Sequence, residues 1–165
     1  MKSDREYRRA TRPAGEVRRR CELFEAECRR RGIRITAQRL AVFRALAEDT
    51  THPTADSVYA RLRSGIAGLS LATVYRILES LEQEGFARRV STTNGARRFD
   101  ANLAPHQHLV CRRCRRIIDS VVRSFEGLRL PRVGLGDFQA ESLDIRIIGT
   151  CGRCRRPGGR RAEAK

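Results

Sequence analysis

The stretch SLATVYRILESLEQEGFARRVSTTNGARRFD, residues 70–100, predicts one helix followed by a two-stranded antiparallel ribbon. Its apolar residues recur at the spacing of a single helix face: Val74, Ile77, Leu78 and Leu81. Gly85 ends the helix, and the pair Asn94-Gly95 favours a tight hairpin because both residues tolerate a positive φ. A helix that leads into such a ribbon is typical of a winged helix-turn-helix domain.

The chain before this stretch predicts three further helices. The first covers about residues 17–31 and ends at Gly32, the second follows Thr36 as N-cap, and the third starts at Thr54. The apolar positions of the first helix include Val17, Leu23, Phe24 and Cys28. Asp56 in the first turn of the third helix suits the positive end of the helix dipole. Residues 16–100 therefore form one predicted domain.

Residues 101–156 predict a second, α/β domain with the order strand, strand, helix, strand. Apolar or alternating runs give strands within 106–111, 115–121 and 141–151, and the stretch 124–130 is a candidate short helix. The whole chain is thus α+β. Residues 1–15 and 157–165 are charged and contain Pro or Gly, so we expect a basic flexible arm and a basic flexible tail.

Two cysteine pairs with C-x2-C spacing lie in this second domain: Cys111, Cys114, Cys151 and Cys154. Each such turn lets two thiolates reach one ion, and four sulfurs complete a tetrahedral structural zinc site. A thioredoxin-like thiol redox role is the alternative, but it needs one pair at a strand-to-helix turn, whereas we expect strands around both pairs. Cys21 and Cys28 share one face of the first helix and are expected to be core or surface thiols.

A second set of candidate ligands contains all three histidines: His52, Asp100, His106, His108 and Asp119. The H-x-H spacing on a strand puts the imidazoles of His106 and His108 on the same face. His52 and Asp100 belong to the first domain, so such a site would bridge both domains. Imidazoles and carboxylates suit borderline or hard ions such as Fe(II), Mn(II) or Zn(II).

The charge of the chain favours nucleic acid as a partner. Its 165 residues carry a net charge of +16, and Lys occurs only at positions 2 and 165, so nearly all of the positive charge is Arg, which binds phosphate bidentately. The N-terminus has no apolar segment typical of a secretory signal, and no run is long enough to span a membrane. We expect a cytoplasmic protein without a membrane partner.

The predicted helix at 71–83 has a face suited to reading double-stranded DNA. Arg76 can pair with guanine, and Tyr75 can contact a thymine methyl group. Ser70 and Thr73 lie at the helix N-terminus, where they could bind phosphates. The alternative is an ordinary amphipathic helix, but the Arg-rich hairpin that follows favours DNA.

The motifs THPTADSVYARLR, SLATVYRILESLEQEGF, RRFD, HQHLVCRRCRRIID and GTCGRC occur in this order between residues 51 and 154. Together they resemble the ferric uptake regulator family, over about residues 18–154. The resemblance implies a homodimeric, metal-dependent repressor of palindromic operator DNA, with an N-terminal winged helix and a C-terminal dimerisation domain. It implies structural zinc on the four cysteines and a regulatory metal on the histidine and aspartate set.

Asp100 and Asp119 resemble the peroxide-sensing branch of that family, whereas the SLATVYR spelling is common among the iron-uptake regulators. The peroxide-sensing branch implies Fe(II) or Mn(II) at the regulatory site and oxidation of His52 or His106 by peroxide with Fe(II) bound. An iron-responsive uptake regulator is the first alternative, and a zinc-uptake regulator is a weaker one.

A zinc hydrolase or deaminase is the remaining alternative class. It needs an open coordination position for water and a general base, whereas four sulfurs close the first site and the second has no base beyond its own ligands. We therefore expect a regulator and not an enzyme.

Overall fold

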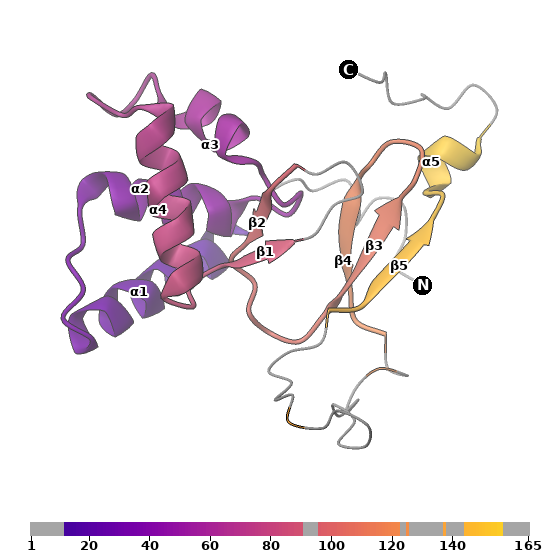
Figure 1. Ribbon diagram of the computed structural model, residues 1–165, viewed down its shortest axis with the longest axis horizontal. Coiled ribbons are helices and arrows are strands. Elements are labelled where there is room, and N and C mark those ends of the chain that lie inside the picture. The colour runs from indigo at the N-terminus through magenta and orange to yellow at the C-terminus, as the bar shows by residue number, and fades with distance from the viewer. Residues whose placement is uncertain (1–11, 91–95, 123–124, 126–136, 138–143, 157–165) are drawn as a thin grey trace. The chain divides into compact units, whose positions relative to one another are not determined.

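The computed structural model describes residues 12–90, 96–122, 125, 137 and 144–156. The chain divides into two compact units between Leu103 and Ala104. The described part of the first unit contains four helices and a two-stranded ribbon, and that of the second contains three strands and a short helix (Figure 1). In the part of the chain that the structure describes, no helix has both the length and the apolar character needed to cross a bilayer.

Four helices build the first unit: α1 (Ala14–Arg30), α2 (Ala37–Glu48), α3 (Ala55–Leu62) and α4 (Leu71–Gln83). Three of them begin at a hydroxyl N-cap. The side chains of Thr36, Thr54 and Ser70 accept hydrogen bonds from backbone N–H groups three residues further on. Gly32 and Gly85 follow α1 and α4 with φ of +68° and +75°, as expected for residues that end helices.

The ribbon of the first unit consists of β1 (Arg88–Val90) and β2 (Arg98–Asp100), which pair antiparallel, with Arg89 opposite Phe99. The predicted hairpin is therefore present, although its Asn94-Gly95 turn lies outside the described residues. Phe99 is fully buried against the helices, so the ribbon is fixed to the core through β2.

One apolar core holds the helices of the first unit together. Phe24 stacks on Phe43 with ring centroids 4.1 Å apart, and Phe86 meets Phe24 edge-on at 4.8 Å. Cys28 is fully buried in this core and Cys21 packs at its edge, so both thiols belong to the core.

The first helix departs from the prediction in two respects. It starts at Ala14 and not near residue 17, because Pro13, with its φ fixed at −57°, can begin a helix. Leu23, one of the apolar positions of the predicted helix, is not on its buried face: it is 62% exposed, since it lies to the side of the stripe formed by Val17, Phe24 and Cys28.

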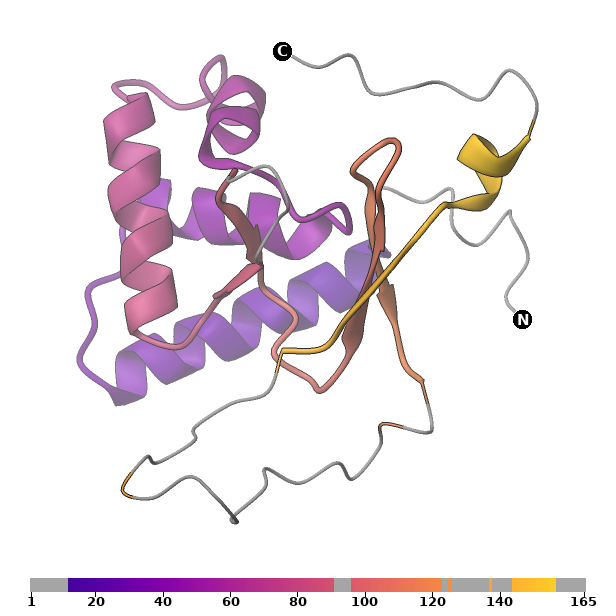
Figure 2. The same cartoon turned by 45° about the vertical axis from the view of Figure 1, so that its right-hand side comes forward.

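The second unit contains a three-stranded sheet in the order β4-β3-β5: β3 (Gln107–Cys111), β4 (Ile117–Ser120) and β5 (Arg146–Gly149). β3 pairs antiparallel with β4 and parallel with β5. After β5 the chain enters the short helix α5 (Gly152–Arg155) (Figure 2). The predicted helix at 124–130 falls almost wholly outside the described residues, as do most of the predicted arm 1–15 and tail 157–165.

Candidate metal centres and nucleic-acid face

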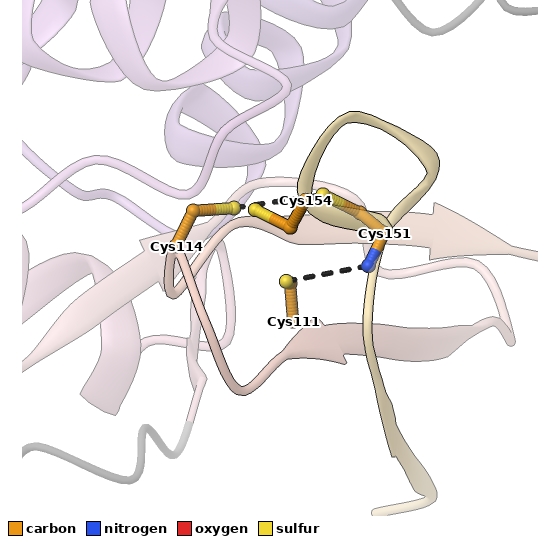
Figure 3. A group of neighbouring side chains, drawn as sticks. All are labelled: Cys111, Cys114, Cys151 and Cys154. Atoms are coloured by element: carbon orange, nitrogen blue, oxygen red, sulfur yellow. Dashed lines mark hydrogen bonds between the residues drawn. The ribbon is translucent and has the colours of Figure 1, made fainter. Parts of the chain in front are cut away.

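Four sulfurs converge at one end of the sheet in the second unit. Cys111 ends β3, Cys114 lies in the turn to β4, and Cys151 and Cys154 lie at the start and within α5 (Figure 3). All four Sγ atoms lie within 4.8 Å of one another, and those of Cys114 and Cys151 are 3.6 Å apart. A tetrahedral zinc ion with Zn–S bonds of about 2.3 Å requires sulfurs roughly 3.8 Å apart, so this group fits zinc.

Backbone hydrogen bonds shape the turn that carries the first pair. Arg115 N–H donates to Cys111 O at 2.8 Å, and Cys111 N–H donates to Arg116 O at 2.9 Å. Arg115 adopts a φ of +58°, in the left-handed region that favours glycine. The tight turn brings the Cys111 and Cys114 thiols to the same side.

The thiols at this centre differ in their affinity for protons. Burial by itself raises the pKa of the Cys111 thiol, but N–H groups of Cys151, Cys114 and Arg113 outweigh it and lower that pKa to about 6. Desolvation, together with hydrogen bonds that the protonated Cys154 thiol donates to the other three sulfurs, raises the pKa of Cys154 to about 12. Coordination to a divalent cation would lower the pKa of the Cys154 thiol again, because a metal displaces the proton of a thiol that it binds.

The expectation that strands surround both cysteine pairs is wrong for the second pair. Cys151 is the N-cap residue of α5, so this pair lies at a strand-to-helix turn. A lone pair at such a turn is the arrangement of thiol oxidoreductases. Here two further sulfurs lie beside it, and none of the six cysteines, all of which are described, forms a disulfide.

A second group of donors in this unit consists of His106, His108 and Asp119. The Nε2 atoms of the two imidazoles are 3.1 Å apart, and Asp119 Oδ1 lies 3.6 Å from the first and 4.0 Å from the second. Asp119 is here because it pairs directly with His108 across the β3–β4 ladder. Two nitrogens bound to one ion at about 2.1 Å lie roughly 3.0–3.4 Å apart, so this pair is spaced as metal ligands are.

The first unit contributes a separate pair, His52 and Asp100. Their side chains are almost completely buried, with His52 Nε2 3.9 Å from Asp100 Oδ2. The loop that carries His52 is tied to β2, since Arg98 donates to His52 O at 2.9 Å and Phe99 N–H donates to Pro53 O at 3.1 Å. His52 has a φ of +57°, which a non-glycine residue adopts only when its surroundings enforce it.

Backbone and arginine contacts also hold Asp100 in place. Its Oδ1 accepts from Asn102 N–H at 2.7 Å. Asn102 is held in turn by Arg88, which donates to its carbonyl at 2.7 Å, and by Arg20 at 3.4 Å.

Within their own units, the structure thus brings together His52 with Asp100 and His106 with His108 and Asp119. That both groups serve one ion remains a prediction.

One charged residue beside these ligands was missed by sequence reasoning. Asp144, just before β5, has its Oδ1 3.7 Å from His108 Nδ1. No local motif marks it, because its place depends on the parallel pairing of β5 with β3.

The residues expected to face DNA lie on α4 and its N-cap. Arg76 is exposed and has no ion-pair or hydrogen-bond partner among the described residues. Tyr75 donates to Asp56 Oδ2 at 3.1 Å, which links α3 to α4 and raises the pKa of Tyr75. Ser70 accepts from Thr73 N–H at 3.1 Å, and the two hydroxyls are 2.8 Å apart, so the hydroxyl expected to bind phosphate caps the helix here.

A winged helix-turn-helix unit, followed by a small sheet with a four-cysteine centre, defines a class of two-unit metalloproteins. The model of the ferric uptake regulator family matches residues 30–147, and the chain belongs to this family. The predicted fold class and the predicted family are therefore confirmed.

Curated relatives include peroxide-responsive repressors from staphylococci. The chain is 33% identical to PerR of Staphylococcus aureus strain Mu50 over 129 residues, which cover 78% of this chain and 87% of the relative. It is 31% identical to PerR of Staphylococcus epidermidis over 133 residues, or 81% and 89% of the two chains.

Solved structures with the same fold include two ferric uptake regulators. The one from Helicobacter pylori, described with three functional metal binding sites, has a TM-score of 0.66 at 25% identity and covers 86% of this chain and 95% of its own. The one from Pseudomonas aeruginosa, solved with manganese, has a TM-score of 0.62 at 25% identity and covers 78% and 97%.

Proposed function

We propose that this protein is a metal-dependent transcriptional repressor that binds palindromic operator DNA as a homodimer and senses peroxide. The observation that carries the proposal is the pair of imidazole Nε2 atoms of His106 and His108, 3.1 Å apart beside Asp119, in a chain whose other unit is a winged helix. The similarity to peroxide-responsive repressors supports the peroxide branch.

Two metals have different tasks in this proposal. Zinc on the four cysteines stabilises the second unit. Fe(II) or Mn(II) binds to His106, His108 and Asp119, and also to His52 and Asp100 of the first unit. Because these five ligands come from both sides of the connection at Leu103–Ala104, the ion restrains the winged helix relative to the sheet. Nitrogen and oxygen donors of this kind suit both metals.

A homodimer would cover apolar residues that are exposed on the second unit. All four residues of the edge strand β5 are exposed, including Ile147 at 37% and Ile148 at 49%. Val121, just after β4, is 64% exposed. An exposed edge strand that carries isoleucines invites a second chain, and a second copy also supplies the twofold symmetry that a palindrome requires.

We place α4 in the major groove, with Arg76 pointing to base edges. Arg76→Ala is expected to weaken operator binding by roughly 1–3 kcal/mol, with the loss concentrated at one base pair. Fluorescence anisotropy on the operator, on single-base variants and on random DNA measures this. Arg44→Ala is the matched control, because it removes the same charge from an exposed residue of α2 that pairs with Glu48. Equal losses on operator and random DNA, or equal losses in both variants, would contradict a base contact by Arg76.

An iron-responsive uptake regulator is the second candidate, because the solved structures that share the fold include ferric uptake regulators. The two candidates differ in their response to peroxide. Fe(II) held by the imidazole ligands would supply the electrons that reduce peroxide beside them, whereas Mn(II) would not readily support this chemistry. The winged helix and the zinc centre have the same tasks in both cases.

Peroxide exposure of the loaded protein tests the peroxide branch. Fe(II)-loaded protein is expected to lose operator binding after brief treatment with dilute peroxide, while Mn(II)-loaded protein retains it. Peptide mass spectrometry is expected to find one added oxygen on the peptide with His52 or on the peptide with His106 and His108. Fe(II) protein that keeps binding DNA, with neither peptide oxidised, would favour the iron-uptake candidate.

Metal content separates a thiol redox protein from a zinc-containing regulator. We expect one tightly held zinc per chain that resists mild oxidation, because all four sulfurs are occupied as ligands. A redox protein instead yields metal-free chains with reversible disulfides.

A further inference from the structure

The two histidines of the second unit present the same ring nitrogen to the same point. His106 Nδ1 donates to Ala104 O at 2.8 Å, because a carbonyl oxygen can only accept. The proton of the neutral ring is therefore on Nδ1, and the lone pair of Nε2 is available to a metal. This Nε2 lies 3.1 Å from Nε2 of His108.

His108 turns the opposite edge of its ring towards a carboxylate. While Nε2 faces His106 and Asp119, Nδ1 lies 3.7 Å from Asp144 Oδ1. The imidazole is buried, with a side chain that is 3% exposed, whereas the Asp144 side chain is 50% exposed. A half-exposed carboxylate can move by the fraction of an ångström that closes this distance to a hydrogen bond.

The pairing of β5 with β3 puts Asp144 at this position. His108 is opposite Arg146 in the parallel ladder, and His108 N–H donates to Ile145 O at 3.2 Å. Residues two apart in an extended chain share a face, so Asp144 and Arg146 lie on the same side. The second oxygen of Asp144 is 3.6 Å from Arg146 Nε, so this contact holds the carboxylate on the same side as Arg146.

We propose that Asp144 is a positioning residue for His108. When a metal binds to Nε2, the Nδ1–H of His108 donates to Asp144, which fixes the tautomer and the ring orientation and increases the donor strength of the imidazole. Asp144 is not itself a ligand of this ion, because it lies on the Nδ1 edge of the ring and the ion on the Nε2 edge. The inference rests on the proposed regulatory metal. It adds to the five proposed ligands a further carboxylate, Asp144, which acts on the ion only through His108.

Substitutions at Asp144 test the proposal in the full-length, zinc-loaded protein. Isothermal titration with Mn(II) is expected to give a Kd about 10–100-fold higher for Asp144→Ala than for the wild type. Asp144→Asn is expected to lie between them, since the amide oxygen still accepts a hydrogen bond but carries no charge. Asp137→Asn is the matched control, because it neutralises another exposed aspartate of the same unit and is expected to leave the Kd unchanged.

Two further measurements separate positioning from a general loss of structure. Zinc content and dimer size are expected to stay at wild-type values in every variant. Long-range nitrogen-15 NMR of the zinc-loaded protein without Mn(II) is expected to show the Nδ1–H tautomer of His108 in the wild type, with more of the Nε2–H tautomer in Asp144→Ala. If Asp144→Ala has the Mn(II) affinity and the His108 tautomer of the wild type, the role of Asp144 is wrong but the regulatory site still stands. If the zinc-loaded wild type binds no Mn(II), the proposed regulatory site is wrong as well.

Discussion

Cys111→Ser is expected to yield a protein without zinc that no longer forms a stable dimer. The four sulfurs lie within 4.8 Å of one another, and a serine hydroxyl is a poor substitute for a thiolate in a tetrahedral zinc site. The apparent free energy of binding a structural zinc ion is roughly 10–16 kcal/mol, much more than a small apolar core contributes. Metal analysis and size-exclusion chromatography with light scattering measure the two effects.

The size of this effect follows from how little else is buried in the second unit. Its buried apolar residues, among those described, are Val110, Cys111, Ile117 and Cys154, so half of them are proposed zinc ligands. Among the residues that the structure describes, the continuous apolar core lies in the first unit. On this proposal, zinc supplies much of the stability around β3 and α5.

Cys21→Ser is the matched control for this prediction. It removes a half-buried thiol from α1, outside the four-cysteine group, and is expected to retain one zinc per chain and the dimer. A Cys111→Ser protein that behaves in the same way would show that the four sulfurs do not hold the structural metal.

The parts of the fold that short-range signals determine could be predicted from the sequence. The hydroxyl caps at Thr36, Thr54 and Ser70 mark helix starts because each satisfies an N–H group of its own first turn. The H-x-H spacing likewise predicted that the imidazoles of His106 and His108 lie close together on one face. This prediction needs only local information, because side chains alternate along an extended chain.

Features that depend on long-range pairing could not be predicted in this way. Asp144 lies beside His108 only because β5 pairs parallel with β3, and nothing in the sequence around either residue sets that register. The positive φ of His52 is likewise enforced by Arg98 and by the link from Phe99 to Pro53, far along the chain. Leu23 shows the limit of a local pattern, because this apolar residue of α1 is exposed although it lies next to the buried stripe.

The His52 position gives the most direct test of how metal and DNA binding are coupled. His52→Ala is expected to keep its zinc and its dimer but to lose metal-dependent operator binding. His52 is the one proposed ligand between α2 and α3, and its carbonyl is held by Arg98 of the wing, so an ion bound there acts on the DNA-binding unit itself. Anisotropy titrations on operator DNA with and without Mn(II) measure the coupling.

Alanine at this position also has a backbone cost, because His52 has a φ of +57°. His52→Asn separates the two effects, since asparagine tolerates the left-handed region but is a weak ligand for these metals. In the wild type, Mn(II) is expected to raise operator affinity by about 5–150-fold, and in His52→Asn by less than about twofold. Binding to random DNA is expected to stay at the wild-type level in both variants, because the exposed arginines of α4 and the wing are unchanged. A His52→Asn protein that responds to Mn(II) as the wild type does would mean that the regulatory ion binds to the second unit alone, and that the restraint on the winged helix has another origin.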